Sequence, residues 1–315
     1  MRRGLTLVEI LVAIFIFLLV LAALYAGFIS LFKSYVKGTT STALEMSSQV
    51  ALDVLRQDIE HAGYGLALDE PSLPVEVKLD SSGYTLFIRS TYNVTNDQTR
   101  GWALVRCMAG NPPVREAPDV PLPSDKVVYL DSNGNSVENS SLGLDLFDFK
   151  KDTCPVSDYL IAYPVPEKVS GTPVCSKQFC AEISYYLGPT SSKNPACPSL
   201  LSLKRNVRWN SGRGSTIPVV DCVADFQVRY NWNGSLVDPA KDAVVKKATP
   251  DELRENLKIV YIYLLVRQGK YEPDYTFTGN TEIDGVKLKL PSDPKSLHYR
   301  WKVLKIAVEP MNLRK

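Results

Sequence analysis

The stretch "MRRGLTLVEILVAIFIF", residues 1–17, joins two arginines, one glycine and one glutamate to the start of a long apolar run. Residues 10–32 contain no charged side chain and no proline. At about 1.5 Å per residue, a helix over these positions rises roughly 35 Å, which exceeds the hydrocarbon thickness of a bilayer. The sequence therefore predicts an N-terminal helix that is long enough to cross a membrane.

Two common kinds of N-terminal segment account poorly for this stretch. A secretory signal has an apolar region of about 7–15 residues followed by a small-residue cleavage site. Here the run is longer, and Leu24 stands where a small residue should precede Ala26. A plain membrane anchor fits the length, and Arg2 and Arg3 would keep the N-terminus in the cytoplasm. Neither alternative explains Glu9.

The segment "RRGLTLVEIL", residues 2–11, resembles the class III signal of type IV prepilins and pseudopilins. The resemblance implies that a prepilin peptidase cuts between Gly4 and Leu5 and methylates the new amino terminus. Glu9 then becomes the fifth residue of the mature chain. Leu5 departs from the commoner phenylalanine at the first mature position.

Glu9 needs a cationic partner in apolar surroundings, because a charged residue at the centre of a membrane helix costs roughly 2.5–3.5 kcal/mol on insertion scales. Cleavage after Gly4 creates an amino group at Leu5 that still carries charge after a single methylation. We hypothesise that Glu9 pairs with this group on a neighbouring subunit and thereby specifies register in a helix bundle.

The helical pattern continues beyond the apolar run. Apolar residues recur at spacings of three, four or seven, as in an amphipathic helix; they are Leu44, Ala51, Leu55, Ile59 and Ala62. Two glycines within residues 62–65 are a stop signal. We therefore predict a leader over residues 1–4, a transmembrane or fibre-core helix over 5–35, and its amphipathic continuation over 36–62.

The remaining residues, 63–315, predict a β-rich head and therefore an α+β fold. Segments rich in β-branched and aromatic residues are separated by turn-forming clusters; they cover 84–91, 102–108, 126–130, 159–163, 180–187, 200–209, 225–232, 259–267 and 301–310. The alternation of Phe226, Val228 and Tyr230 indicates a core-facing strand. A short helix is expected from Thr249, with Pro250 at its first position.

Two segments are rich in proline, and the first of them is expected to be loop. Residues 111–125 contain five prolines, and residues 154–198 are rich in proline and serine. We interpret both as insertions that decorate one sheet-based head rather than as linkers between domains.

Six cysteines follow the apolar run, which fits disulfide formation in an oxidising compartment. They are Cys107, Cys154, Cys175, Cys180, Cys197 and Cys222. Six cysteines allow fifteen pairings. The short loop between Cys175 and Cys180 favours that pair, and the other pairings stay open, as does the presence of free thiols. A zinc site is disfavoured because the sequence contains no C-x-x-C motif.

Composition and motifs favour a non-enzymatic protein without a cofactor. The formal net charge is +2, without a block of like charges, so nucleic-acid binding has no support. The only histidines, His61 and His298, are far apart in sequence, and the common hydrolase, phosphate-loop and zinc-protease motifs are missing. The loop from Asp131 has Ser136 and Leu142 where a calcium-binding loop needs glycine and glutamate, so a tight hairpin is the better interpretation.

Both ends of the chain resemble the large minor pilins of the PilW family. The resemblance rests on "ALDVLRQDIEHAGYG" (51–65), "LKRNVRW" (203–209) with "STIPVVDCVADFQVRYNWNG" (215–234), "LKIVYIYLLVRQ" (257–268) and "HYRWKVLKIAVEPMNLRK" (298–315). It does not extend to residues 71–198. The charges of "RQDIE" are compatible with a solvated helix face or with a subunit contact.

The resemblance implies a type IV pilin-like fold and a structural role. Such a protein is held in the inner membrane with its head in the periplasm, helps to prime pilus polymerisation, and sits at or near the fibre tip at the cell surface. Its partners would be other minor pilins, the major pilin, the prepilin peptidase and the inner-membrane assembly platform, with a tip adhesin left open. The alternatives are a J-type pseudopilin of type II secretion and a membrane-anchored binding or enzymatic domain.

Overall fold

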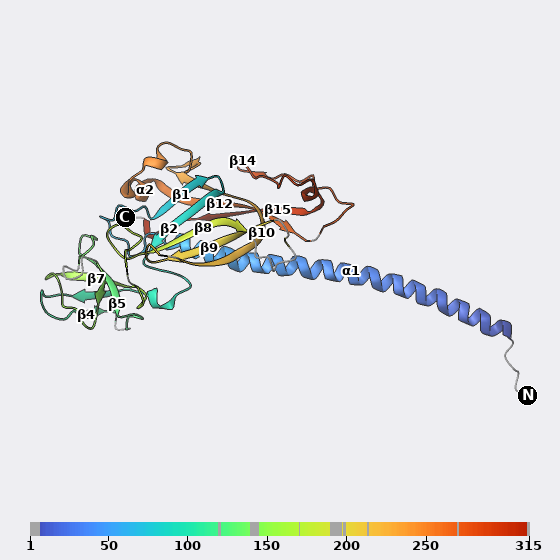
Figure 1. Cartoon of the computed structure of the whole chain (residues 1–315), viewed down its shortest axis with the longest axis horizontal. Helices are drawn as coiled ribbons and strands as arrows, with labels where there is room; N and C mark the ends of the chain where they lie inside the picture. The colour runs from blue at the N-terminus through green and yellow to red at the C-terminus, as the bar shows by residue number, and fades with distance from the viewer. Residues whose placement is uncertain are drawn as a thin grey trace, which may run out of the picture.

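The computed structural model describes residues 7–118, 121–138, 145–169, 171–189, 197, 200–212, 214–269 and 271–313. One long helix, α1 (Leu7–Glu60), enters a β-rich head with its C-terminal end, and its N-terminal half extends away from the head (Figure 1). Its 54 residues rise about 80 Å. The predicted α+β fold, an apolar N-terminal helix followed by an antiparallel sheet-rich head, is confirmed.

The main sheet of the head has eight strands, and all neighbouring strands are antiparallel. Along the sheet the strands are β1 (Val75–Asp80), β2 (Gly83–Ser90), β8 (Ala181–Pro189), β9 (Leu201–Arg208), β10 (Ser215–Trp232), β12 (Leu257–Gln268) and β15 (Arg300–Val308), and β11 (Ser235–Val237) pairs with β10. Each segment that the sequence predicted as a strand in these regions is a strand.

A second, five-stranded sheet lies at the end of the head opposite the projecting helix (Figure 1). Its order is β4 (Val114–Ala117), β3 (Ala103–Arg106), β7 (Tyr159–Pro164), β5 (Lys126–Leu130) and β6 (Phe147–Asp148). It has its own hydrophobic cluster, which includes Val105, Val127 and Leu160.

The expectation of continuous loop over residues 111–125 is wrong at β4. This strand occupies the edge of the second sheet and pairs with β3 alone. Pro113 and Pro118 flank β4 without interrupting its hydrogen-bond ladder, which is the position that proline tolerates best in a sheet. The proline-rich segment therefore builds part of a sheet instead of only decorating one.

Short elements complete the head. They are the helix α2 (Pro250–Asn256), the hairpin of β13 (Glu282–Ile283) and β14 (Val286–Lys287), and the 3-10 turns η1 (Asp97–Thr99), η2 (Val245–Lys247), η3 (Pro294–His298) and η4 (Met311–Leu313). The predicted start of α2 is confirmed: Thr249 caps it, Pro250 occupies its first turn, and Glu252 completes a capping box.

The two faces of the main sheet bury different clusters. Residues of β12 alternate between them: Ile262 and Leu264 belong to the cluster beneath α1, whereas Tyr263 and Leu265 face the β13–β14 hairpin. Burial on both faces explains why β12 is an almost uninterrupted apolar run rather than an alternating one. Phe226, Val228 and Tyr230 of β10 are buried with the first cluster, as the sequence predicted.

The end of α1 packs into the head through Leu55 and Ile59, which are fully buried. The predicted glycine stop is confirmed by Gly63, which has a φ of +80°. A Cβ at Gly63 would also lie 2.7 Å from Leu313 Cδ2, so a larger residue would strain the backbone and force the Leu313 side chain to shift.

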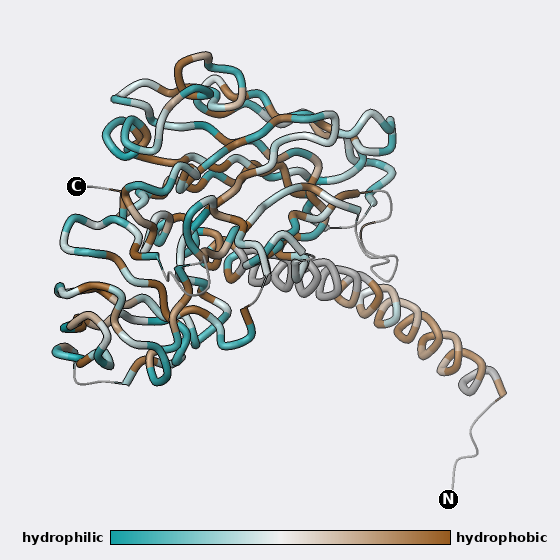
Figure 2. Tube along the Cα trace, turned by 60° about the vertical axis from the view of Figure 1, so that its left-hand side comes forward, coloured by the Kyte–Doolittle hydropathy of each residue, from teal (hydrophilic) through white to brown (hydrophobic). Residues whose placement is uncertain are grey.

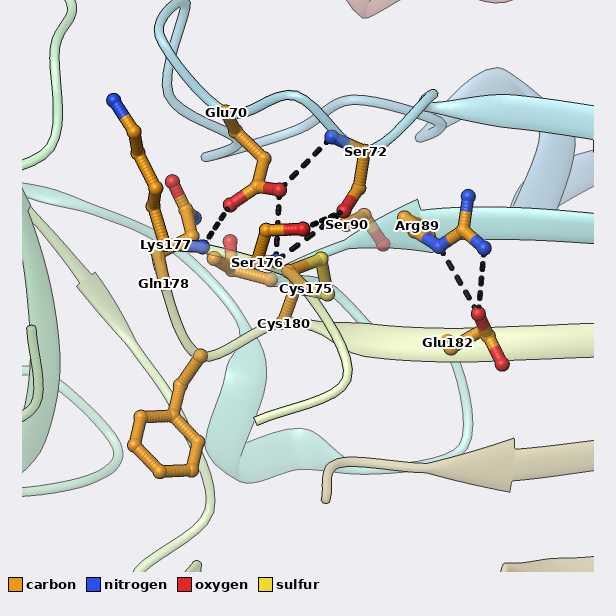
Figure 3. Close-up of a disulfide and its surroundings, with 12 residues drawn as sticks. Glu70, Ser72, Arg89, Ser90, Cys175, Ser176, Lys177, Gln178, Cys180 and Glu182 are labelled. Carbon is orange, nitrogen blue, oxygen red and sulfur yellow. Dashed lines mark hydrogen bonds and ion pairs between the residues drawn. A yellow bond between two sulfur atoms is a disulfide. The ribbon is translucent and has the colours of Figure 1, made fainter. Parts of the chain in front are cut away.

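The six cysteines form three disulfides, Cys107–Cys154, Cys175–Cys180 and Cys197–Cys222. The Cys175–Cys180 loop is fastened to the segment that follows α1 (Figure 3). The buried Glu70 carboxylate accepts hydrogen bonds from the backbone N–H groups of Ser72, Ser176 and Lys177 at 2.7–2.9 Å. A buried carboxylate with three donors is a stable arrangement for a negative charge.

A second buried carboxylate beside this loop predicts a pH dependence of folding. Asp145 Oδ1 accepts a hydrogen bond from Phe179 N, but Oδ2 has no partner among the described residues. Burial, together with the charges of Glu70 and Glu138, raises the pKa of Asp145 to about 7. Because an unfolded aspartate titrates near 4, stability should fall as the pH rises from about 4 to 7, by up to about 4 kcal/mol.

The Asp145→Asn variant tests this dependence. We expect its unfolding free energy to vary less than that of the wild type between pH 4 and 7, and to exceed it at pH 8. Urea unfolding of the full chain in detergent at several pH values provides the measurement. Asp69→Asn is the control of opposite sign, because hydrogen bonds from Lys177 and Ser136 outweigh burial and lower the pKa of Asp69. Parallel pH profiles of wild type and Asp145→Asn would contradict the prediction.

Candidate functional site: the apolar helix and its anchorage in the head

The apolar half of α1 lies entirely outside the head. The segment Leu11–Ile29 is long and apolar enough to cross a membrane, and none of it is buried in the protein. Figure 2 shows hydrophobic residues along the projecting part of the helix. Its exposed large side chains include Leu11, Ile14, Phe15, Phe17, Leu18, Leu21, Leu24, Phe28 and Leu31.

Such a surface is unfavourable in water. Each large aliphatic or aromatic side chain gains about 1.5–3 kcal/mol when it moves from water to an apolar environment. A contiguous helical surface of this kind requires lipid or other helices as its neighbours. The geometry therefore fits insertion in a membrane and packing within a helix bundle.

The predicted processing residues precede or begin this helix. Gly4 and Leu5 lie outside the described residues. The backbone of Glu9 belongs to α1, but the structure does not describe its side chain. The roles of these three residues therefore remain predictions.

A buried ion pair fixes the other end of α1 to the sheet. Arg205 of β9 donates from Nε to Asp58 Oδ2 at 2.6 Å and from a terminal nitrogen to Oδ1 at 2.9 Å. The Tyr185 hydroxyl donates to the same carboxylate at 2.5 Å, and Asn93 Oδ1 accepts from Arg205 at 2.8 Å. Asp58 and Arg205 are each only 1% exposed.

The electrostatics of this pair follow from its burial. Burial alone would lower the pKa of Arg205, but the hydrogen bonds and the charge of Asp58 raise it. Burial and the neighbouring Asp58 raise the pKa of Tyr185 well above its ordinary value. The group thus holds one positive and one negative charge side by side, with a neutral hydroxyl hydrogen bonded to the carboxylate.

Sequence reasoning missed the role of Asp58, although a signal was present. Asp58 is three residues after Leu55 and four before Ala62, so it lies on the apolar face of the helix rather than on the charged face. By contrast, Arg56 and Glu60 form a surface pair with a distance of 2.7 Å. The solvated-face interpretation of "RQDIE" therefore fails for Asp58, whereas the exposed Arg56 is compatible with a solvated face or with a subunit contact.

The described part of the head contains no cluster of side chains comparable to a metal centre. Among the described residues, no group of three or more His, Cys, Asp or Glu side chains could hold a metal ion. The Asp131 loop is a hairpin turn in which Asp131 Oδ1 accepts from the backbone N–H groups of Asn133 and Asn135. The Asp131 carboxylate thus serves as the hydrogen-bond acceptor that stabilises the turn.

Comparisons with known proteins bear on the helix. Residues 1–25 match the family model of the prokaryotic N-terminal methylation motif, a type IV prepilin signal. No curated protein matches the chain significantly. A type IV-like pilin from Thermus thermophilus is similar in structure, with a TM-score of 0.42 and 14% identity over 86% of this chain and 97% of that one. The matched motif contains Gly4, Leu5 and Glu9 and leads directly into the exposed apolar segment.

Proposed function

We propose that this protein is a minor pilin of the PilW kind, a structural subunit that helps to prime type IV pilus polymerisation. The observation that supports it is the methylation motif of residues 1–25, continuous with a helix whose apolar half is exposed and whose other end is locked into a head. This arrangement lets one helix reside first in lipid and then in a fibre core without a change in the head. We propose no reaction of its own for the protein.

The size of the head supports a position at or near the fibre tip. About 250 residues follow Ala62, and the described ones form a five-stranded sheet and a two-stranded hairpin in addition to the eight-stranded main sheet. A head of this bulk crowds a tight helical lattice but is tolerated at an end. The second sheet, at the end of the head remote from the apolar helix, would then face outward and could support an adhesin (Figure 1).

The proposed location and partners follow from the same signal. Before assembly the chain spans the inner membrane once, with its head in the periplasm, where the three disulfides are stable. A prepilin peptidase processes it between Gly4 and Leu5. Other minor pilins, the major pilin and the inner-membrane assembly platform are its proposed partners.

Two alternatives share some of these features. A J-type pseudopilin of type II secretion has the same N-terminal plan, and loss of protein export rather than loss of twitching in a deletion strain would favour it. A membrane-anchored binding or enzymatic domain would use the helix only as an anchor. The two classes differ in the covalent state of the N-terminus.

Mass spectrometry of the protein purified from its native cells tests the proposal. We expect a mature chain that begins at Leu5 and carries one added methyl group on its amino terminus. Deletion of the prepilin peptidase gene should restore residues 1–4 and abolish the methylation, which provides the control. An intact Met1, or a cut after residue 25, would overturn the pilin assignment and leave an anchored domain.

A further inference from the structure

A cavity of about 290 Å³ lies at one end of the main sheet, where β12 ends and β15 begins. Its walls come from η3, from the start of β15 and from the last residues of β12; they include Arg267, Lys295, Ser296, Tyr299 and Trp301. Figure 1 places this end of the head on the side toward which the apolar half of α1 projects. The cavity is therefore remote from the second sheet.

Arg267 is the unusual member of this wall. Its side chain is buried, with the residue only 3% exposed, yet Nε has no hydrogen-bond partner in the part of the chain that the structure describes. The contacts of its guanidinium are a terminal nitrogen 3.8 Å from Cys222 Sγ and the ring of Tyr299, whose centroid lies 4.3 Å away. Sulfur is a weak acceptor, and an aromatic face offsets only part of the desolvation of a cation.

The other buried arginines of the described chain show what Arg267 lacks. Arg89 is paired with Glu76 and Glu182. Arg205 is paired with Asp58, and the Arg254 guanidinium lies 3.6 Å from the Asp251 carboxylate. Among the described residues, no carboxylate forms an ion pair with Arg267. A buried cation without a counter-charge costs several kcal/mol, so this position selects for an anion from outside the chain.

The rest of the wall is compatible with an anionic occupant. Lys295 adds a second positive charge, whereas the Asp293 carboxylate accepts a hydrogen bond from Lys295 N at 2.9 Å as the cap of η3. The Trp301 indole N–H is already bound to Ser296 O at 2.8 Å, so it fixes the shape of the wall rather than offering a donor. The volume is sufficient for a phosphate, sulfate or carboxylate group with its hydration.

We propose that this cavity is a binding site for an oxyanion group, held by the guanidinium of Arg267 with help from the ammonium of Lys295. A planar guanidinium binds two oxygens of a carboxylate or phosphate at once, which a lysine cannot do. The site is independent of the proposed pilin function, since it rests on the head alone. The oxyanion is either free in solution or carried by a phospholipid headgroup.

The experiment uses the full chain in a non-ionic maltoside detergent, with arginine side chains labelled with ¹⁵N. Sodium phosphate is titrated at constant ionic strength, and the Nε–H resonance of Arg267, assigned from the Arg267→Lys variant, is followed. We expect a saturable shift of this resonance and a rise in the melting temperature of the wild type with phosphate. Arg267→Lys should weaken binding at least about tenfold, and Lys295→Gln should weaken it only a few-fold.

Arg300→Gln is the matched control, because Arg300 is the neighbouring exposed arginine and is already paired with Glu272. It should bind phosphate as the wild type does. A second arm places the wild type in phosphatidylglycerol nanodiscs without added phosphate, and a shift there alone identifies a lipid headgroup as the source. No shift of the Arg267 resonance in either arm, or undiminished binding by Arg267→Lys, would overturn the proposal.

Discussion

Replacement of Asp58 by alanine is expected to lower the free energy of unfolding by about 3–5 kcal/mol, the usual cost of removing one partner from a buried ion pair. Asp58 accepts three hydrogen bonds inside the head, two from Arg205 and one from Tyr185. Alanine would leave the guanidinium of Arg205 buried without a counter-charge and the Tyr185 hydroxyl without an acceptor. Urea unfolding of the full chain in detergent, followed by near-ultraviolet circular dichroism, measures the loss.

Loss of the ion pair should also weaken the attachment of α1 to the head. Asp58 lies between Leu55 and Ile59, the residues that pack α1 into the sheet, so loss of the pair weakens the attachment of the projecting rod to the head. Limited proteolysis should therefore cut Asp58→Ala near the end of α1 at protease concentrations that leave the wild type intact. If α1 moves relative to the head, the orientation of the head on a fibre is no longer fixed.

Two controls separate this effect from the general loss of a charge. Arg56→Ala removes the surface pair with Glu60 on the next turn and should cost less than about 1 kcal/mol. The double variant Asp58→Leu/Arg205→Met replaces both charges by apolar side chains and should be more stable than either single change. Equal destabilisation by Asp58→Ala and Arg56→Ala would show that the buried pair does not anchor the helix.

Elements whose pattern is dictated by burial were predictable from the sequence. The length of α1 follows from its apolar run and amphipathic continuation, and β12 follows from a dense set of β-branched and aromatic residues. The start of α2 follows from the capping preference of Thr249 and Pro250. In each case the local residue preferences and the tertiary packing favour the same conformation. The element can therefore be predicted without knowing which elements pack against it.

Elements stabilised by a distant partner were missed. β1 has a clear alternation, with Val75 and Val77 toward the core and Glu76 and Lys78 outward, but it is short and follows two prolines. β4 forms because its backbone pairs with β3. The first half of β10 contains Pro218. This half pairs with β9 on one side only, because the pairing with β12 begins at Val223. Such strands depend on pairing rather than on their own propensity.

The charged residues illustrate the same limit at the level of side chains. Asp58 and Arg205 are 147 positions apart, and no local pattern joins them. That no described carboxylate pairs with Arg267 is likewise a property of the folded surroundings. A sequence shows that a charge stands on an apolar face or strand, but only the fold shows whether a counter-charge meets it.

Replacement of Glu9 by valine is expected to reduce incorporation into fibres by roughly a hundredfold. If Glu9 pairs with the methylated amino group of a neighbouring subunit, valine leaves that ammonium unpaired in an apolar bundle. A loss of about 3 kcal/mol, the low end for a broken buried pair, corresponds to about two powers of ten. Immunoblots of sheared fibres and of membranes provide the measurement, and the variant should accumulate in the membrane because its helix has become more apolar.

Processing and folding must be unchanged for this result to bear on pairing. Mass spectrometry should show that Glu9→Val still begins at Leu5, and the head should retain its three disulfides. Glu45→Gln removes a carboxylate from the same helix beyond the apolar run and should assemble normally. In the wild type, immunogold labels should gather at fibre ends, and in Glu9→Val these labels should disappear. Normal labelling of Glu9→Val fibres would contradict the pairing, because an unpaired ammonium would then carry no penalty within the bundle.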